Sequence, residues 1–213
     1  MNSSVVRVFG NQFLNAFGIQ LPTIVEHIPT EILTISGEKL IIQELFRLED
    51  DTLLHIEYQS SASPDDLDQL FVDLMWYDLK IGEKHGKLIN TIVVLGSAIN
   101  KAELSRDLGA IKYKVTEAVW LSKQNGDQLT EELTKKVEQK GELTDEELSK
   151  LIMLPFMQTN ISRFQRTVQS IQIANQLVDK GKRDMVTKLM KTMAKKILTG
   201  DDFEQVVQAL AKA

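Results

Sequence analysis

The stretch LLHIEYQSSASPDDLDQLFVDLMWYDLKIGEKHGKLINTIVVL (residues 53–95) indicates the fold of this chain, because its hydrophobic pattern changes period twice. Residues 52–59 alternate as a strand does, and Ser63 followed by Pro64 is typical of a helix start. Residues 87–97 then form a nearly unbroken apolar run, which is typical of a buried strand. A strand, a helix and a second strand in this order ordinarily make a parallel crossover, so we expect an α/β core.

The segments before this crossover predict an antiparallel meander that completes a mixed sheet. Its three strands are expected at residues 31–35, 39–49 and 52–59. Residues 4–17 have the spacing of a helix that precedes them. We therefore predict a core of helix, three-strand meander, helix and strand within residues 1–110. The pattern beyond it is mainly helical, and we predict an α-helical C-terminal extension, residues 111–213, that packs on the core.

The composition is that of a soluble globular protein, with 43% hydrophobic and 26% charged residues. No apolar run approaches the roughly 18 residues that a membrane span needs, so we expect no membrane partner. The sequence contains no cysteine, which excludes disulfides, thiolate zinc sites and cysteine nucleophiles. The first residues also lack the basic start and the apolar stretch of a signal peptide, and we expect a cytoplasmic location.

Charge is unevenly distributed along the chain. Residues 1–100 contain 6 Lys/Arg against 14 Asp/Glu, whereas residues 151–199 contain 9 Lys/Arg against 2 Asp. This division is compatible with an acidic metal site and a basic phosphate-binding surface, although charge asymmetry is also common without a functional meaning. In the basic segment, Lys188, Lys191 and Lys195 fall on one face of an expected helix. We interpret them either as a solvated face or as a weak DNA-binding surface.

Within the meander, Glu44 and Glu57 are candidate metal ligands. If Asp50 and Asp51 form a two-residue turn, Glu44 lies directly opposite Glu57, with Cβ atoms about 4.5–5.5 Å apart. Like charges at that distance destabilise a sheet unless a cation lies between them or one carboxyl holds a proton. The oxygen ligands would suit Mg²⁺; the alternative is two solvated side chains on an exposed strand face. His55 we interpret as part of the scaffold.

A resemblance to a known family adds to this pattern. The segments PTEI, QELFRLEDDTLLHIEYQSS, LFVDLMWYDLKI and INTIVVL together resemble the PD-(D/E)XK nuclease superfamily, and more narrowly the recombination-promoting nuclease / putative transposase family. LLHIEYQSS is the most specific piece, and the later LSKLIMLPFM is similar to another family element. The resemblance implies that Glu44 and Glu57 bind Mg²⁺ or Mn²⁺. It also implies that Gln59 stands where the superfamily motif has Lys, and that Tyr77 matches a tyrosine of the family's helix.

The resemblance implies a divalent-metal-dependent DNA endonuclease, or a nuclease-related transposase-like protein. Such a protein would hydrolyse phosphodiester bonds with Glu44, Glu57 and Gln59 as catalytic residues, and RNA is the alternative substrate. Two departures from the family pattern support a second hypothesis: Glu44 replaces the usual Asp, and Asp73 replaces a helical Arg. On that hypothesis the chain is a catalytically degenerate nuclease-fold protein. It would act as a binding or self-assembly module, with a homo-oligomer formed through its helical C-terminal part.

Overall fold

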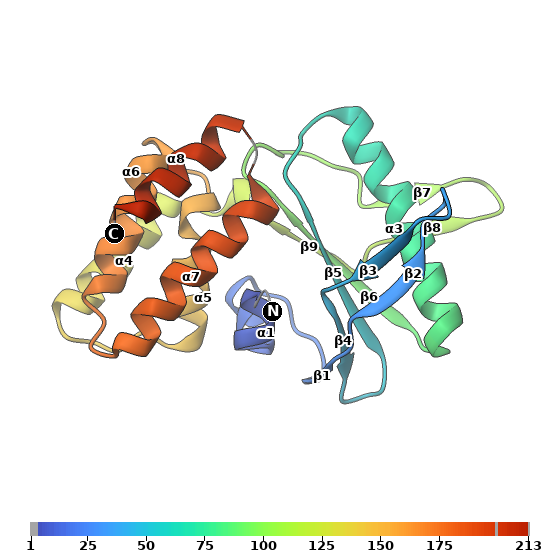
Figure 1. Cartoon of the computed structure of the whole chain (residues 1–213), viewed down its shortest axis with the longest axis horizontal. Helices are drawn as coiled ribbons and strands as arrows, with labels where there is room; N and C mark the ends of the chain where they lie inside the picture. The colour runs from blue at the N-terminus through green and yellow to red at the C-terminus, as the bar shows by residue number, and fades with distance from the viewer. Residues whose placement is uncertain (1–3, 199, 213) are drawn as a thin grey trace.

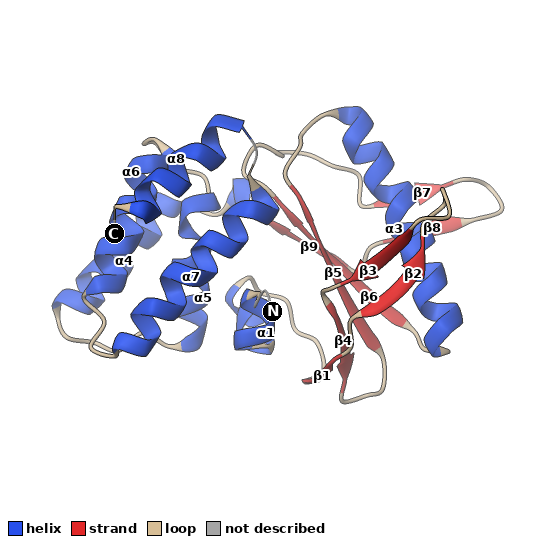
Figure 2. Cartoon of the chain, viewed as in Figure 1, coloured by secondary structure: helices blue, strands red, loops and turns tan. Residues whose placement is uncertain are grey.

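The structure, a computed structural model of the whole chain, describes residues 4–198 and 200–212 (Figure 1). Its centre is a five-stranded mixed sheet with the strand order β1-β4-β5-β6-β9. These strands are β1 (Ile24–His27), β4 (Leu45–Leu48), β5 (Leu53–Gln59), β6 (Ile89–Leu95) and β9 (Glu117–Trp120). One long helix lies against one face of the sheet, and the N-terminal and C-terminal helices lie on the other side (Figure 2).

The stretch from residue 53 to residue 95 folds as its sequence predicts. β5 and β6 pair in parallel, with Leu53 opposite Ile89 at one end of the pairing. Helix α3 (Pro64–His85) connects them, and the Ser63 side chain accepts a hydrogen bond from the N–H of its first turn. Gly86 ends the helix in the left-handed conformation, with φ 64°. The expected α/β class with a mixed sheet is therefore confirmed.

The antiparallel half of the sheet contains three strands, but two of the predicted segments are wrong. Its first strand is β1, which the sequence did not suggest, paired with β4. Residues 31–35 instead contribute to β2 (Thr30–Leu33), which forms a separate hairpin with β3 (Lys39–Ile42). The predicted strand 39–49 is thus divided between two sheets. The division arises because the hairpin buries its own apolar side chains against α3, in one cluster with Ile81.

The N-terminal segment forms two short helices rather than the one expected over residues 4–17. These helices are α1 (Val5–Phe9) and α2 (Asn11–Ala16). Gly10 separates them with φ 54°, a conformation that ends a right-handed helix. Both helices still bury apolar side chains, as the spacing indicates.

The sheet extends beyond residue 110, where we expected the α/β core to end. β9 pairs in parallel with β6 as its fifth strand. A small hairpin of β7 (Ser105–Asp107) and β8 (Lys112–Lys114) precedes β9. The boundary was missed because these strands have three or four residues, too few for an alternating pattern to stand out.

The rest of the chain is helical, as predicted, and packs on the sheet. Its helices are α4 (Gly126–Glu138), α5 (Asp145–Met153), α6 (Arg163–Asn175), α7 (Lys180–Ile197) and α8 (Gly200–Ala211), with 3₁₀ turns at Leu121–Lys123 and Leu154–Phe156. One apolar cluster joins the helices to the sheet, and its members include Phe13, Leu54, Ile92, Leu151 and Met190. Among the helices within the described residues, none is long and apolar enough to cross a membrane.

Candidate functional site

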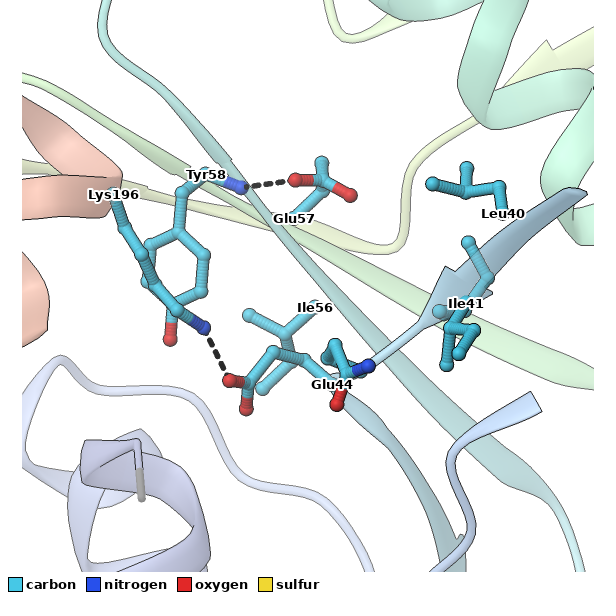
Figure 3. A pocket seen from close by; sticks show the side chains of 9 residues that line it. Leu40, Ile41, Glu44, Ile56, Glu57, Tyr58 and Lys196 are labelled. Carbon is cyan, nitrogen blue, oxygen red and sulfur yellow. Dashed lines mark hydrogen bonds and ion pairs between the residues drawn. The ribbon is translucent and has the colours of Figure 1, made fainter. Parts of the chain in front are cut away.

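β4 and β5 separate at Glu44, and a pocket of about 280 Å³ lies beside that point. Their last hydrogen bond runs from the Ile56 N–H to the Glu44 carbonyl (2.9 Å), and the preceding chain turns into β3. Residues 57–59 of β5 continue beyond that bond and pair with β6. We call this cavity the β4–β5 pocket; its lining consists of residues 40–44, residues 56–58 and Lys196. Figure 3 shows its side chains.

The predicted register, with Glu44 directly opposite Glu57, is wrong by one residue. Leu45 lies opposite His55, which places Glu44 beside Ile56. The cause is the turn: Asp51 adopts a left-handed conformation with φ 67°, and the connection has three residues instead of two. Because side chains alternate along a strand, Glu44 and Glu57 leave the sheet on opposite faces. Both still line the β4–β5 pocket.

Glu44 is 6% exposed, and each of its carboxylate oxygens has a partner. Oε2 accepts a hydrogen bond of 2.6 Å from the Ser4 hydroxyl, at the start of α1. Oε1 forms an ion pair with the ammonium group of Lys196, in the last turn of α7 (Figure 3). The carboxylate therefore links the sheet to the first and the seventh helix.

Tyr58 forms the wall of the pocket beside this ion pair. The Lys196 ammonium lies 4.6 Å from the centroid of the Tyr58 ring, a cation–π distance. The Tyr58 hydroxyl is buried and has no hydrogen-bond partner within the described part of the chain. Burial and the charges of Glu44 and Glu57 raise the pKa of this phenol, so it stays protonated near neutral pH.

On the other face, Glu57 adjoins a buried network centred on His55. The His55 Nδ1 atom lies 2.7 Å from Asp78 Oδ1, and its Nε2 atom lies 3.8 Å from a Glu57 oxygen, the distance of an ion pair. Asp78 also accepts hydrogen bonds from the hydroxyl groups of Thr91 and Tyr113, both 2.5 Å long. His55 is thus a buried scaffold residue that lies between two carboxylates.

The pKa of His55 follows from these neighbours. Burial lowers it, but the contacts with Asp78 and Glu57 outweigh the burial and raise the pKa to about 9. His55 is therefore an imidazolium near neutral pH, and it compensates the charges of both carboxylates. Asp78 was not identified from the sequence. The available signal was an acidic residue among the apolar positions of α3, on a helix that packs against β5.

Gln59 and Tyr77 lie beside Glu57 in a second cavity of about 420 Å³, between β5 and the first half of α3. The amide of Gln59 donates to the Asp66 carbonyl (3.3 Å). Asp73, the residue at the position of the family's Arg, lines the same cavity and accepts a hydrogen bond from Gln69. Gln59 is thus close to Glu57 but belongs to a different pocket from Glu44.

The three lysines predicted as a DNA-binding surface, Lys188, Lys191 and Lys195, are exposed along α7. Their helix brings the neighbouring Lys196 into the β4–β5 pocket. Lys196 was not identified from the sequence, although a signal was present. Lys196 lies seven residues after Leu189 and three residues after Met193, which is the spacing of the apolar stripe of this helix. A lysine at such a position faces the protein interior.

The chemistry of the donors suits a hard divalent cation. The carboxylate oxygens of Glu44 and Glu57 are of the type that Mg²⁺ and Mn²⁺ prefer, although the two carboxylates point away from each other across the pocket (Figure 3). The described residues contain no group of three or more His, Asp or Glu side chains arranged to hold a metal. Mg²⁺ needs no such cage, since one or two carboxylates with water and substrate oxygens commonly hold it. A cation, the Lys196 ammonium, already lies at Glu44.

Comparisons with protein-family models, with curated proteins and with solved structures found no match.

Proposed function

We propose that the chain is a divalent-metal-dependent nuclease of the PD-(D/E)XK type that hydrolyses phosphodiester bonds of DNA. The observation that carries the proposal is the β4–β5 pocket. Two carboxylates, that of Glu44 just before β4 and that of Glu57 within β5, line one cavity at the point where these antiparallel strands separate. A mixed sheet in which a helix joins two parallel strands, β5 and β6, is compatible with the fold that the sequence resemblance implies.

The chemistry of phosphodiester hydrolysis assigns roles to these residues. A metal held by Glu44 and Glu57 would activate a water and neutralise the charge that develops on the phosphoryl oxygens. The buried imidazolium of His55 positions Glu57 through an ion pair with its carboxylate. Gln59 lies two residues further along β5, on the same face of the strand as Glu57. Gln59 carries no charge, so its role is to orient a water or a phosphate oxygen by hydrogen bonds.

The position of the basic helix supports a nucleic-acid substrate. α7 carries exposed lysines along its outer surface and reaches the β4–β5 pocket at its C-terminal end. A phosphate backbone lying on α7 would therefore pass close to the two carboxylates. Lysines bind such a backbone through its charge, without regard to sequence.

Cleavage of supercoiled DNA in Mg²⁺ or Mn²⁺ tests the proposal. We expect nicking by the wild-type chain and none by Glu57→Gln, which keeps the shape of the side chain but removes its charge. Glu49→Gln is the matched control, because Glu49 is an exposed glutamate on the same hairpin. Equal cleavage by wild type and Glu57→Gln would point to a contaminating nuclease and would contradict the proposal, as would no cleavage at all. A parallel assay with single-stranded and duplex RNA identifies the preferred nucleic acid.

A second function, a non-catalytic binding or self-assembly module, is favoured by one specific observation. Both oxygens of Glu44 already have protein partners, Ser4 and Lys196, which join the helical part to the sheet. On this alternative the ion pair of Glu44 and Lys196 is structural. Calorimetry would then give the same result for the wild type and for Glu57→Gln, with no specific Mn²⁺ binding to either. Self-assembly would appear as a concentration-dependent mass in light scattering.

A further inference from the structure

One edge of β5 is unpaired beyond Glu44. At the end of the strand the Gln59 carbonyl accepts a hydrogen bond from the Gly96 N–H, so Gln59 and every second residue before it direct their backbone groups toward β6. The residues between them direct theirs to the opposite side, where the hydrogen bonds with β4 end at Glu44. Within the described residues, the carbonyls of Ile56 and Tyr58 on that side have no hydrogen-bond donor.

The Tyr58 N–H on the same edge is covered by a side chain instead of a strand. It donates a hydrogen bond of 3.1 Å to the carboxylate of Glu57, the preceding residue (Figure 3). In a sheet this N–H would bond to a carbonyl of the neighbouring strand. The Glu57 side chain is 35% exposed, so the carbonyl of an incoming chain can take its place. Unpaired edges of this kind are templates for the pairing of another extended chain.

β3 has a free edge on the other side of the same gap. In its partner strand β2, the carbonyls of Glu31 and Leu33 point out of the hairpin and accept hydrogen bonds from the α3 side chains of Lys84 and Trp76. Because Ile41 lies opposite Glu31, its backbone groups also point out of the hairpin, away from β2. The lining of the β4–β5 pocket includes β3 and no described residue of β2, so the free edge of β3 is the one beside the pocket.

The space beside these edges is long enough to form a groove, and the groove is acidic. The β4–β5 pocket is continuous with the second cavity, because Leu40, Glu57 and Tyr58 line both. The second cavity adds the carboxylates of Asp66 and Asp73, and its described lining contains no lysine or arginine. Neither aspartate has an ion-pair partner within the described part of the chain. Such a groove attracts a chain that carries basic side chains.

We propose that this groove binds an extended, basic peptide of a partner protein, which pairs with the free edge of β5 where β4 ends. Backbone hydrogen bonds to the Ile56 and Tyr58 carbonyls supply affinity, as in other cases of strand addition. The side chains of the peptide alternate between the two faces of the sheet. They are lysine or arginine on the face of Glu57 and α3, and apolar on the face of Ile56.

The charge of the chain favours a partner protein over a second copy as the source of this peptide. The whole chain has a net charge of −5, so two copies repel each other on average, whereas a basic partner is attracted. The proposal does not depend on nuclease activity, because it concerns backbone pairing and charge at the groove. Its readout is therefore binding, measured without a nucleic acid.

The test is calorimetric titration of a capped seven-residue peptide of alternating valine and arginine into the whole chain. Two matched peptides separate the contributions: one has glutamate in place of arginine, and the other has N-methyl groups on its amides, which remove the backbone donors. Asp73→Asn removes one carboxylate of the groove. Glu49→Gln is the control variant, because Glu49 is an exposed acidic residue outside both cavities. Circular dichroism verifies that both variants are folded, and amide NMR shifts map the bound peptide.

We expect the arginine peptide to bind and to change the amide shift of Tyr58, and the glutamate and N-methylated peptides to show no binding. Asp73→Asn should bind the arginine peptide about 10-fold more weakly, and Glu49→Gln as tightly as the wild type. No binding of the arginine peptide at millimolar concentration overturns the proposal, and so does equal binding of the N-methylated peptide. A dimer that forms without peptide and shifts the Tyr58 amide would assign the edge to a second copy and overturn it as well.

Discussion

Lys196, in the last turn of α7, forms an ion pair with Glu44, the residue just before β4, across 152 positions of the sequence. The contact joins the helical part of the chain to the sheet at the point where β4 and β5 separate. Ser4 completes the arrangement from the N-terminal helix. Three segments that are distant in the sequence thus meet at one buried carboxylate.

The first prediction concerns the stability of this pair. Lys196→Met should lower the free energy of unfolding by about 1–2 kcal/mol, because a buried carboxylate loses its counter-ion. The expected loss is smaller than for a fully buried pair, because solvent screens the partly exposed Lys196. Urea unfolding followed by tryptophan fluorescence measures it. The control Lys195→Met should change stability by no more than about 0.5 kcal/mol. A double-mutant cycle with Glu44→Gln isolates the pair, and a coupling energy of zero would show that the two residues do not stabilise each other.

Several features of the fold were predictable because they depend on local pattern. The crossover of residues 53–95 combines strand alternation, a Ser-Pro helix start and a glycine stop, and all three signals agree. The helical extension follows from the helical spacing of its apolar residues, and in the structure Thr144 and Glu147 form a capping box at the start of α5. Such signals depend on residues that are close in the sequence, because backbone conformation, helix capping and the period of apolar side chains are local properties of the chain.

The register of the β4–β5 hairpin was not predictable in the same way. Two adjacent acidic residues are compatible with a two-residue or a three-residue turn, and Asp51 adopts the left-handed conformation of the longer one. One residue of difference moves Glu44 to the other face of the sheet. Lys87 pairs with Asp51 from the neighbouring β6 end, a contact that no local pattern could report.

The partners of the candidate site residues were not predictable because they are tertiary contacts. Asp78 approaches His55 from α3, Tyr113 approaches Asp78 from β8, and Lys196 approaches Glu44 from α7. The sequence identified Glu44, Glu57 and Gln59 as polar positions on strands. It did not indicate which of them would already have a charged partner.

The second prediction is a pH dependence of stability that originates at His55. Its pKa is raised to about 9 in the folded chain, from about 6.5 in an unfolded chain. The imidazolium therefore contributes stability that is complete below pH 6.5 and is lost as the pH rises toward 9. The shift corresponds to about 3 kcal/mol at most.

Measuring the free energy of unfolding at pH 6 and at pH 9 tests this pH dependence. Wild type should lose more stability than His55→Gln over this interval, because the variant has no proton to release. Each protein is compared with itself at the two pH values, so groups common to both cancel. Parallel pH profiles for the two proteins would show that His55 does not hold a proton between Asp78 and Glu57.

The third prediction concerns Asp78, whose carboxylate serves three donors. Asp78→Asn should lower the free energy of unfolding by about 2–3 kcal/mol, because a buried imidazolium loses its closest anion and hydroxyl groups lose a charged acceptor. The same change should lower the pKa of His55, measurable from the imidazole proton shifts by NMR. Tyr113→Phe removes a single donor from the same carboxylate, and we expect a smaller loss, about 1 kcal/mol. A His55 pKa that is unchanged in Asp78→Asn would contradict the assigned network.

The fourth prediction tests α7 as the surface that binds DNA. Replacing Lys188, Lys191 and Lys195 together by Gln should weaken duplex binding at low salt, because each lysine that neutralises a phosphate releases counter-ions on binding. The slope of log K against log salt should become shallower by about 0.9 for each phosphate that the variant no longer neutralises. Fluorescence anisotropy at several salt concentrations measures both quantities. The control makes the same change of net charge elsewhere in the helical part, at Lys135, Lys140 and Lys150. Only α7 brings its lysines next to the pocket that Glu44 and Glu57 line, so the control variant should retain the wild-type slope. Equal losses of affinity in the two triple variants would assign the effect to net charge and not to α7.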